Sequence, residues 1–342
     1  MKRFDHILVI KSGALGDLIA GTTALRVLRD AFPDSRITLL TNNLMKEVCP
    51  PGVFYDEAVY TVDRAPAWKG FLSSLGEVRK KKTGLAVNLR WSSEGSAYMT
   101  LLSGAKARAG SGPRGSRWIY NIRAPLFEGR RHEFLRHLDI VRACGAPESV
   151  PEPYVHVAGA DRRFAGEALA GIAGKAAKLI VFHPGASTPS KAWPAEHFVE
   201  LGRLFVRTFD SPIIVTWGPG ENALAGEITA GIGARAHLAP STTIGGLAAL
   251  IGSCSMCVCN YSGVMNVSMA VKTPLLALGC TSPEDWGPYG DLHRTVSAFR
   301  GEDAYSETGR AAAMRSISVE SVWNVLQSRW RELDVHRTAV TA

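Results

Sequence analysis

The fold is decided by one stretch near the middle of the chain, Val181-Phe182-His183-Pro184-Gly185-Ala186-Ser187, followed by Lys191-Ala192-Trp193-Pro194. Its residues predict a buried strand, then a loop of small and hydroxyl-bearing residues, then a lysine just ahead of a helix. Small residues let backbone N–H groups approach an anion, hydroxyls donate hydrogen bonds, and an ammonium supplies charge. We therefore expect a phosphate site here, where a second domain would begin.

Short apolar strands alternate with helices along the chain. In the first half, strands are expected at 7–10, 37–40 and 85–89, with a helix after the loop 11–17. In the second half, the expected strands are 179–182, 213–216, 256–259 and 275–277, and the expected helices 195–208, 223–230, 244–251 and 264–271. This alternation predicts an α/β fold with two doubly wound parallel sheets.

The length of 342 residues suits two domains, and the prolines between Pro147 and Pro153 indicate a connection between them. Parallel α/β sheets bind ligands outside the carboxyl ends of their strands, so the loops after 10, 182, 216 and 259 are expected to face one cleft. We expect an N-terminal domain at 1–150, a linker with a connecting helix at 151–176, a C-terminal domain at 177–333 and a flexible tail at 334–342.

The composition is typical of a soluble, cytoplasmic protein. Only four apolar residues, 7–10, follow the polar start, which is too short for a secretory signal, and no stretch approaches the roughly 20 apolar residues of a membrane span. The six cysteines lie mostly among apolar or small residues, as reduced buried cysteines do. Cys254, Cys257 and Cys259 resemble half of a metal site, but no second Cys/His pair lies nearby, so we expect no metal.

Positive charge is concentrated in the window 101–142, where nine Lys and Arg face three acidic residues. One interpretation is a solvated basic face, and the other is contact with a polyanion such as anionic lipid head groups. Neither a zinc-finger spacing nor an aromatic RNA-binding pattern is present, so a nucleic-acid partner is not expected.

Asp17 opens the first helix, after the loop Ser12-Gly13-Ala14-Leu15-Gly16. This loop lacks the G-x-G-x-x-G spacing of a dehydrogenase, and the chain has no P-loop of the kind found in kinases. An acid at this position either caps the helix or acts as a general base. We expect Ser12, Gly13 and Gly16 to lie near the second substrate of such a base.

Three other strand ends carry candidate binding residues. Lys191 is placed to contact phosphate, whereas His183 is expected only to hydrogen-bond within its own loop. Glu221 either caps the next helix or accepts hydrogen bonds from ribose hydroxyls. Ser262 and Gly263 would present backbone donors and the positive end of a helix to an anion.

Taken together, these motifs resemble the bacterial ADP-heptose:lipopolysaccharide heptosyltransferases, glycosyltransferase family 9. The likeness spans nearly the whole chain and rests on Ile7-Leu8-Val9-Ile10 with Gly16-Asp17, Arg131-His132-Glu133, His183-Pro184-Gly185-Ala186 with Lys191-x-Trp193-Pro194, Gly218-Pro219-x-Glu221, Ser262-Gly263-x-Met265, and Trp286-Gly287-Pro288-Tyr289.

The resemblance implies a GT-B fold, in which two Rossmann-like domains face across a cleft. It implies an inverting, metal-independent transfer of a heptose or related sugar from an ADP-sugar, bound by the C-terminal domain. The acceptor, bound by the N-terminal domain, would be an anionic glycolipid of the lipopolysaccharide inner core. No cofactor is implied beyond the nucleotide sugar. We expect a cytoplasmic monomer that contacts the inner face of the inner membrane.

The resemblance also assigns roles to residues. Asp17 matches the general base, and Lys191 matches the lysine on the donor diphosphate. Glu221 matches the acid near the ribose. The remaining donor-binding residues implied by the resemblance are Ser187, Thr188, Tyr261, Ser262, Gly263, Val264 and Met265.

Two positions depart from the family pattern. Tyr261 stands where the family usually has an aspartate, and Asn266 stands where it usually has a histidine. A tyrosine donates one hydrogen bond but supplies no charge. Two alternatives therefore stay open: a glycosyltransferase of the same fold that uses another nucleotide sugar, and a protein that binds nucleotide or glycan without catalysis.

Overall fold

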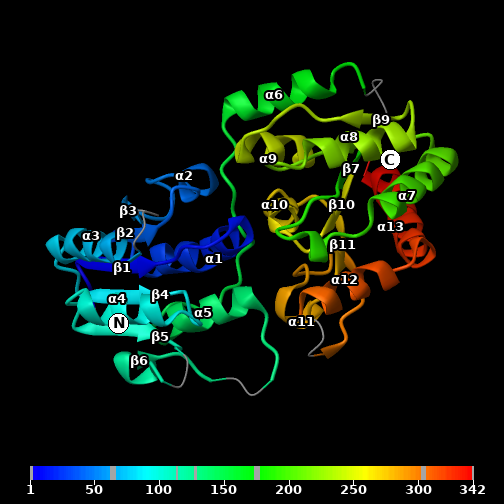
Figure 1. Cartoon of the computed structure of the whole chain (residues 1–342). Helices are drawn as coiled ribbons and strands as arrows, with labels where there is room; N and C mark the ends of the chain where they lie inside the picture. The colour runs from blue at the N-terminus through cyan, green and yellow to red at the C-terminus, as the bar shows by residue number, and fades with distance from the viewer. Residues whose placement is uncertain are drawn as a thin grey trace. The chain divides into compact units, whose positions relative to one another are not determined.

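The structure is a computed structural model that describes residues 3–61, 67–112, 115–126, 129–172, 178–301 and 306–340. The chain divides into two units, Met1–His156 (unit 1) and Val157–Ala342 (unit 2). Each unit is built on a six-stranded parallel sheet flanked by helices (Figure 1). The predicted α/β fold with two doubly wound parallel sheets is confirmed.

Unit 1 has the strand order β3-β2-β1-β4-β5-β6, with β1 near the centre. Its strands are β1 (His6–Ile10), β2 (Arg36–Thr41), β3 (Glu57–Tyr60), β4 (Leu85–Asn88), β5 (Ala107–Gly110) and β6 (Ile122–Arg123). Its helices are α1 (Leu15–Ala31), α2 (Met45–Val48), α3 (Ala67–Lys80), α4 (Glu94–Leu102), α5 (Glu133–Ala143) and the short 3-10 helix η1 (Arg117–Ile119).

The centre of unit 1 is an apolar core, because the side chains on both faces of β1 are apolar and buried. Ile7, Leu8 and Val9 are fully buried, and α1 buries every residue from Leu18 to Leu28 except Arg26. Helix α1 packs against α5, and α3 packs against α4. A parallel sheet covered by helices on both faces requires such continuous apolar strands.

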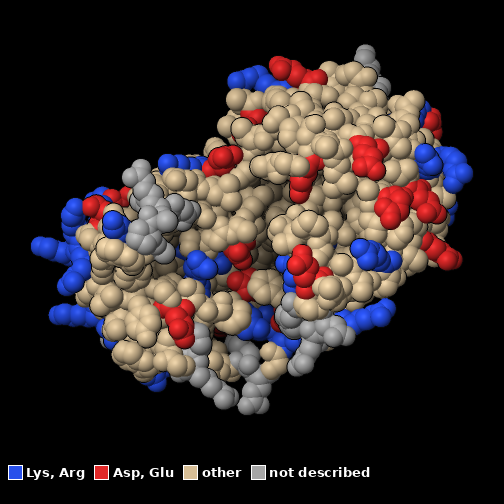
Figure 2. Space-filling model, in the orientation of Figure 1, with Lys and Arg blue, Asp and Glu red and all other residues tan. Residues whose placement is uncertain are grey.

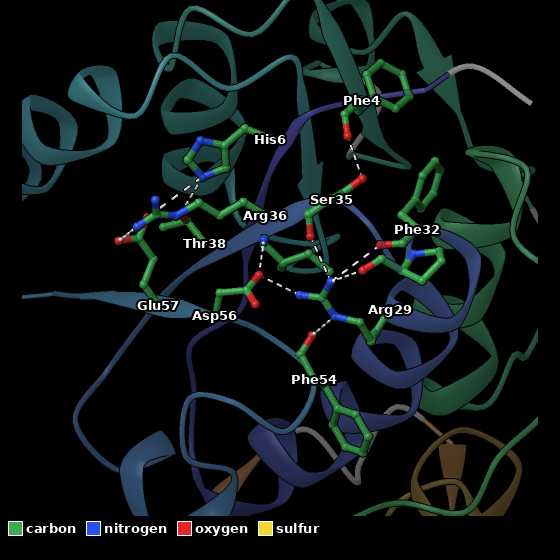
Figure 3. Close-up of polar contacts among 12 residues, drawn as sticks. Phe4, His6, Arg29, Phe32, Ser35, Arg36, Thr38, Phe54, Asp56 and Glu57 are labelled. Carbon is green, nitrogen blue, oxygen red and sulfur yellow. Dashed lines mark hydrogen bonds and ion pairs between the residues drawn. The ribbon is translucent and has the colours of Figure 1, made fainter.

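Polar contacts close the amino-terminal end of this sheet (Figure 3). Arg29, in the last turn of α1, donates to the carbonyl oxygens of Pro33 (3.1 Å) and Ser35 (2.8 Å) and to the Asp56 carboxylate (2.6 Å). The same Asp56 oxygen accepts the backbone N–H of Ile37 at 2.6 Å. Arg29 therefore ties the end of α1 to the chain entering β2 and β3.

A second set of contacts surrounds Glu57, the first residue of β3 (Figure 3). Its carboxylate accepts hydrogen bonds from Thr38, Arg36 and Lys81 at 2.7, 3.0 and 2.7 Å. Burial raises the pKa of Glu57, but these donors outweigh it and lower the pKa to about 2. Glu57 therefore stays ionised and anchors the edge strand β3.

Unit 2 has the strand order β12-β11-β10-β7-β8-β9, again parallel throughout. Its strands are β7 (Ile180–His183), β8 (Ile213–Val215), β9 (Ala236–Leu238), β10 (Met256–Asn260), β11 (Leu275–Gly279) and β12 (Arg294–Ser297). Its helices are α6 (Gly159–Leu169), η2 (Pro189–Lys191), α7 (Ala195–Phe209), α8 (Asn222–Ile232), α9 (Ile244–Gly252), α10 (Gly263–Ala270), α11 (Pro283–Trp286), α12 (Glu307–Ser316) and α13 (Val319–Val340).

One face of the unit 2 sheet carries most of its aromatic core. Trp193, Phe198 and Phe205 lie with Trp330 of α13 against the strands, and the rings of Phe205 and Trp330 meet edge to face at 4.9 Å. Such aromatic pairs add stabilisation beyond the apolar area they bury. Helix α13 is thereby fixed to unit 2.

Several boundaries differ from those predicted. Helix α6, expected within the linker, packs against α9 and belongs to unit 2, and the division falls after His156 rather than at 150. Helix α13 continues to Val340, past residue 334, where the tail is expected to begin from the sequence. The short strands β3, β5, β6, β9 and β12 were not predicted, because they lie toward the sheet edges and carry few apolar residues.

Within the described residues, no helix has the length and apolarity needed to cross a bilayer.

We predict that Arg29→Met lowers the free energy of unfolding by about 2 kcal/mol, because several buried carbonyls and Asp56 lose their donor. The matched control is Arg36→Met. The Arg36 side chain is 61% exposed, against 20% for Arg29, so its loss should cost at most about 1 kcal/mol. Urea denaturation measures both, and equal midpoints for the two variants would contradict the role given to Arg29.

Candidate active site

In unit 1, the loop between β1 and α1 is held in a fixed shape around Asp17. Gly13 has φ +153°, and a Cβ at this position would lie 2.6 Å from an Asp17 oxygen, so only glycine fits. Asn42, after β2, donates to the Gly13 carbonyl at 2.8 Å, and Arg90, after β4, donates to the Ser12 hydroxyl at 2.9 Å. Side chains from two neighbouring strand ends thus anchor the loop.

The Asp17 carboxylate accepts the backbone N–H of Ala14 through Oδ2 at 3.1 Å. This contact is the helix cap that the sequence suggested, and Gly16 lies beside it in the first turn of α1. Among the described residues, Oδ1 has no hydrogen bond, and the side chain is partly exposed. The cap fixes the carboxylate while one oxygen stays available for a proton.

The arginines of the window 101–142 are largely engaged in holding their own loops. Arg108, Arg117 and Arg123 donate to backbone carbonyl oxygens, and Arg131 and Arg142 bind the Asp139 carboxylate. On the face drawn in Figure 2, many Lys and Arg side chains instead gather along the edge of unit 1 where α3 lies. Arg114 and Glu128 of the window lie outside the described residues.

In unit 2, one side chain organises the loop that follows β7. Asn260, fully buried at the end of β10, donates to the carbonyl oxygens of Pro184 at 2.8 Å and Gly185 at 3.2 Å. Its own oxygen accepts the N–H of Trp193 at 3.1 Å. Asn260 therefore clamps both sides of the turn that carries Lys191.

Lys191 ends η2 and has no ion-pair partner among the residues that the structure describes. Burial raises the pKa of the nearby Cys280 thiol, and Lys191 and Arg310 lower it, so both cations lie close to Cys280. Arg310, on α12, donates to the Ser190 hydroxyl at 3.4 Å. A second cation that the sequence analysis missed thus stands beside Lys191.

The two hydroxyl residues ahead of Lys191 are placed differently. Ser187 is exposed, and the hydroxyl of the partly buried Thr188 lies 3.2 Å from that of Ser190. Thr188 therefore lies on the same turn as Lys191, whereas Ser187 faces solvent.

Glu221 turns back over the loop after β7. Its Oε2 accepts the backbone N–H of Gly218 at 2.8 Å and lies 3.7 Å from His183 Nε2. Glu221 is the N-cap residue of α8, but its side chain makes no capping hydrogen bond to that helix. Burial lowers the pKa of His183 to about 4, so the ring is neutral near pH 7 and its contact with Glu221 is not an ion pair. The hydrogen bond of His183 goes to Thr216, which follows β8, at 3.1 Å, and not to its own loop as the sequence suggested.

A cavity of about 470 Å³ lies beside Glu221, a size common for small-molecule sites. Its walls come from the loop after β7, the start of α7 and the helix α12. The residues that line it include Gly185, Ala186, Trp193, Pro194, Glu221, Leu224 and Arg315.

Helix α10 begins beside the same strand ends. Ser262 precedes it, and its Oγ is buried without a hydrogen-bond partner among the described residues. Gly263, Val264 and Met265 form the first turn, whose backbone N–H groups have no acceptor within the helix. The side chains of Val264 and Met265 are only 5% exposed, so this turn offers mainly backbone donors.

Tyr261 points toward β12. Its hydroxyl lies 2.6 Å from the Thr295 hydroxyl, and its ring covers Gly279, where a Cβ would come within 2.6 Å of it. Burial raises the pKa of Tyr261 to about 12, so the phenol is neutral. Asn266 is buried and donates to the Ser262 carbonyl at 3.4 Å. The two departures from the family pattern are thus both uncharged and both tied to their own unit.

The cysteines are free, as predicted. Cys254, Cys257 and Cys259 are buried, and burial raises the pKa of Cys254 to about 12. In the part of the chain that the structure describes, no three His, Cys, Asp or Glu side chains converge as metal ligands would.

Two Rossmann-like parallel sheets, one with cations, a carboxylate and a helix start around its strand ends, define an α/β protein of two units. The sequence profile of glycosyltransferase family 9 (heptosyltransferase) matches residues 79–314, and the chain belongs to this family. The resemblance drawn from the sequence motifs is confirmed.

Curated relatives match part of the chain. Lipopolysaccharide heptosyltransferase 2 of Salmonella typhimurium is 33% identical over 131 residues, which cover 36% of this chain and 37% of that protein. The chain thus matches somewhat more than a third of the length of such relatives.

Solved structures show that the fold is shared over nearly the whole chain. A glycosyltransferase family 9 protein from Veillonella parvula superposes with a TM-score of 0.80 at 23% identity, covering 96% of this chain and 98% of its own. An Escherichia coli heptosyltransferase solved with ADP gives a TM-score of 0.73 at 17% identity, covering 95% and 99%.

We predict that Gly185→Ala destabilises unit 2 by about 1–3 kcal/mol, because the added methyl group would overlap the Glu221 carboxylate. Gly226→Ala on α8 is the control. No atom lies within 4 Å of its new methyl group, and alanine favours the helix by up to about 1 kcal/mol. Thermal unfolding should therefore shift in opposite directions. A Gly185→Ala variant as stable as wild type would show that Glu221 is not held against this loop.

Proposed function

We propose that this protein transfers a heptose or related sugar from an ADP-sugar to a lipopolysaccharide inner-core acceptor, with inversion at the anomeric carbon. One observation carries the proposal. Asn260 clamps the loop after β7 so that Lys191, with no ion-pair partner among the described residues, remains available for an anion. Family membership supports the reaction class, and the fold shared with a heptosyltransferase solved with ADP supports the choice of nucleotide.

The donor diphosphate would be bound in unit 2. Lys191 would neutralise it, Arg310 lies close enough to add a second charge, and the first turn of α10 supplies backbone donors. Glu221 borders a cavity large enough for a nucleoside and would accept hydrogen bonds from the ribose. Fixed donors of this kind contribute about 3 kcal/mol each where charge develops on a leaving group.

Asp17 would act as the general base. The acceptor oxygen attacks the anomeric carbon, its proton passes to an Asp17 oxygen, and the bond to the diphosphate breaks with its electron pair going to the phosphate oxygen. The cap to Ala14 fixes Oδ2, which leaves Oδ1 as the proton acceptor. Positioned bases contribute roughly 10²–10⁴-fold to such reactions.

The acceptor would be an anionic glycolipid at the inner face of the inner membrane. The basic window of unit 1 also carries two exposed apolar side chains, Trp118 and Leu126, which are 61% and 57% exposed. An aromatic side chain among cations is typical of a surface that meets lipid head groups. We propose that the window contributes to acceptor binding.

We predict that Asp17→Asn lowers kcat for transfer by about 10²–10⁴-fold, because the amide cannot take a proton. ADP binding should be unchanged. The test is a transfer assay on inner-core glycolipid, run beside an ADP-binding assay on the same preparation. Transfer at the wild-type rate would remove Asp17 from the role of base.

We predict that ADP raises the unfolding temperature of the wild type and that Lys191→Ala abolishes the rise. At a hundredfold excess over Kd, binding contributes about 2.7 kcal/mol. Lys178→Ala serves as control, because that lysine precedes β7 and lies over the Trp330 ring, 5.3 Å from its centroid. UDP, GDP and CMP complete the panel.

The panel also tests the alternatives that Tyr261 raises. A selective response to UDP or GDP would keep the reaction class and replace the ADP-sugar donor. A wild type that responds to no nucleotide would contradict the proposed donor site and favour a protein that binds glycan without catalysis.

A further inference from the structure

A lysine is buried directly behind the loop that carries Asp17. Lys11 follows β1 and is 3% exposed, and its backbone N–H bonds to the Leu40 carbonyl at 3.0 Å. Its side chain runs beneath α1 at Gly21, where a Cβ would lie 2.9 Å from Lys11 Cγ. The passage under α1 therefore depends on a glycine.

The ammonium ends among polar groups of α5. Lys11 Nζ lies 2.8 Å from His137 Nε2 and 3.8 Å from Glu133 Oε1. The same His137 nitrogen lies 3.0 Å from Glu133 Oε1, and Trp91 donates to the other Glu133 oxygen at 2.9 Å. With Lys11 protonated, the ammonium donates to a neutral His137 ring and pairs with the carboxylate.

Such a cluster does not stabilise a fold as well as apolar side chains of similar volume, because burial removes the water around each charge. Burial lowers the pKa of Lys11, while Glu133 and then Asp17 raise it and Arg90 lowers it. Burial raises the pKa of Glu133, but His137, Lys11 and Trp91 lower it to about 2. The net effect lowers the pKa of Lys11, and the contacts with Glu133 and His137 are what favour its protonated form in this buried position.

We propose that Lys11 is a positioning residue for Asp17. Its ammonium, held between Glu133 and His137, fixes the Ser12–Asp17 loop to α5 and keeps a positive charge near the carboxylate. This inference rests on the proposed role of Asp17 as the base. Lys11 itself touches no reacting atom, and it acts by holding in place the loop that carries Asp17.

The charged groups that face this lysine come from three elements. Glu133 and His137 lie on α5, Asp17 lies on α1, and Arg90 follows β4. Glu133 and Asp17 raise the pKa of Lys11, whereas Arg90 lowers it. Replacing Lys11 therefore removes a cation that faces two carboxylates and one other cation.

The test uses Lys11→Met and the double variant Lys11→Met/Glu133→Gln. The double variant removes both charges together, so it leaves no unpaired buried ion and should fold. Lys81→Met/Glu57→Gln is the matched control, because it removes a partly buried pair at the opposite end of the same sheet. The readouts are kcat and KM against pH, and hydrogen exchange of the peptide 11–18.

We expect the double variant to lower kcat by about 10–100-fold with donor KM within about twofold, because a misplaced base costs rate rather than binding. Exchange of the peptide 11–18 should rise, and the control should change none of these.

Unchanged kcat and exchange in a folded double variant would overturn the proposal, as would an equal loss in the control. If the wild type transfers no sugar, the proposed function fails. The exchange measurement still decides on Lys11 in that case, because it does not depend on transfer.

Discussion

The donor side of this protein depends on the carboxamide of Asn260. Parallel strands bring their carboxyl ends to one edge, but they do not fix the loops that follow them. Asn260 does so by satisfying two carbonyls of the turn after β7 and the N–H that opens α7. An amide offers a donor and an acceptor in one rigid plane, which no carboxylate or ammonium does. Because this contact is neutral, it places Lys191 without consuming its charge.

In unit 1, the role that we propose for Asp17 requires a carboxylate held in a fixed position. Capping α1 fixes Asp17 but also draws on its negative charge. The buried cluster of Lys11, Glu133 and His137 supplies a counter-charge from within the unit rather than from solvent. A buried charge cannot be screened by salt as a surface ion pair can. Burying these charged groups lowers the stability of unit 1 relative to apolar side chains of similar volume, but it fixes their positions beside the loop that carries Asp17.

The sequence predicted the central strands and the helices that follow them, because continuous apolar runs and small-residue loops are local signals. It also predicted that Lys191 and Ser262 would lie at strand ends. It did not predict the direction of Glu221, which depends on the absence of a side chain at Gly185. Nor did it reveal Lys11, whose partner His137 lies 126 positions away, or Asn260, which follows the predicted strand 256–259 and is the last residue of β10 in the structure. Contacts between distant segments leave no periodic trace in a sequence.

Tyr261 changes the charge of the donor side. A carboxylate at this position would oppose a diphosphate, whereas the neutral phenol leaves Lys191 and Arg310 without that competition. The ring also occupies the space above Gly279, and its hydroxyl is bonded to Thr295. If the proposed donor sugar lies near this residue, its recognition there would come from uncharged hydrogen bonds and from shape. Such a site would reject a sugar whose hydroxyl groups leave a buried hydrogen-bonding group of the protein without a partner. The free-energy cost of that unsatisfied group exceeds the gain from one hydrogen bond.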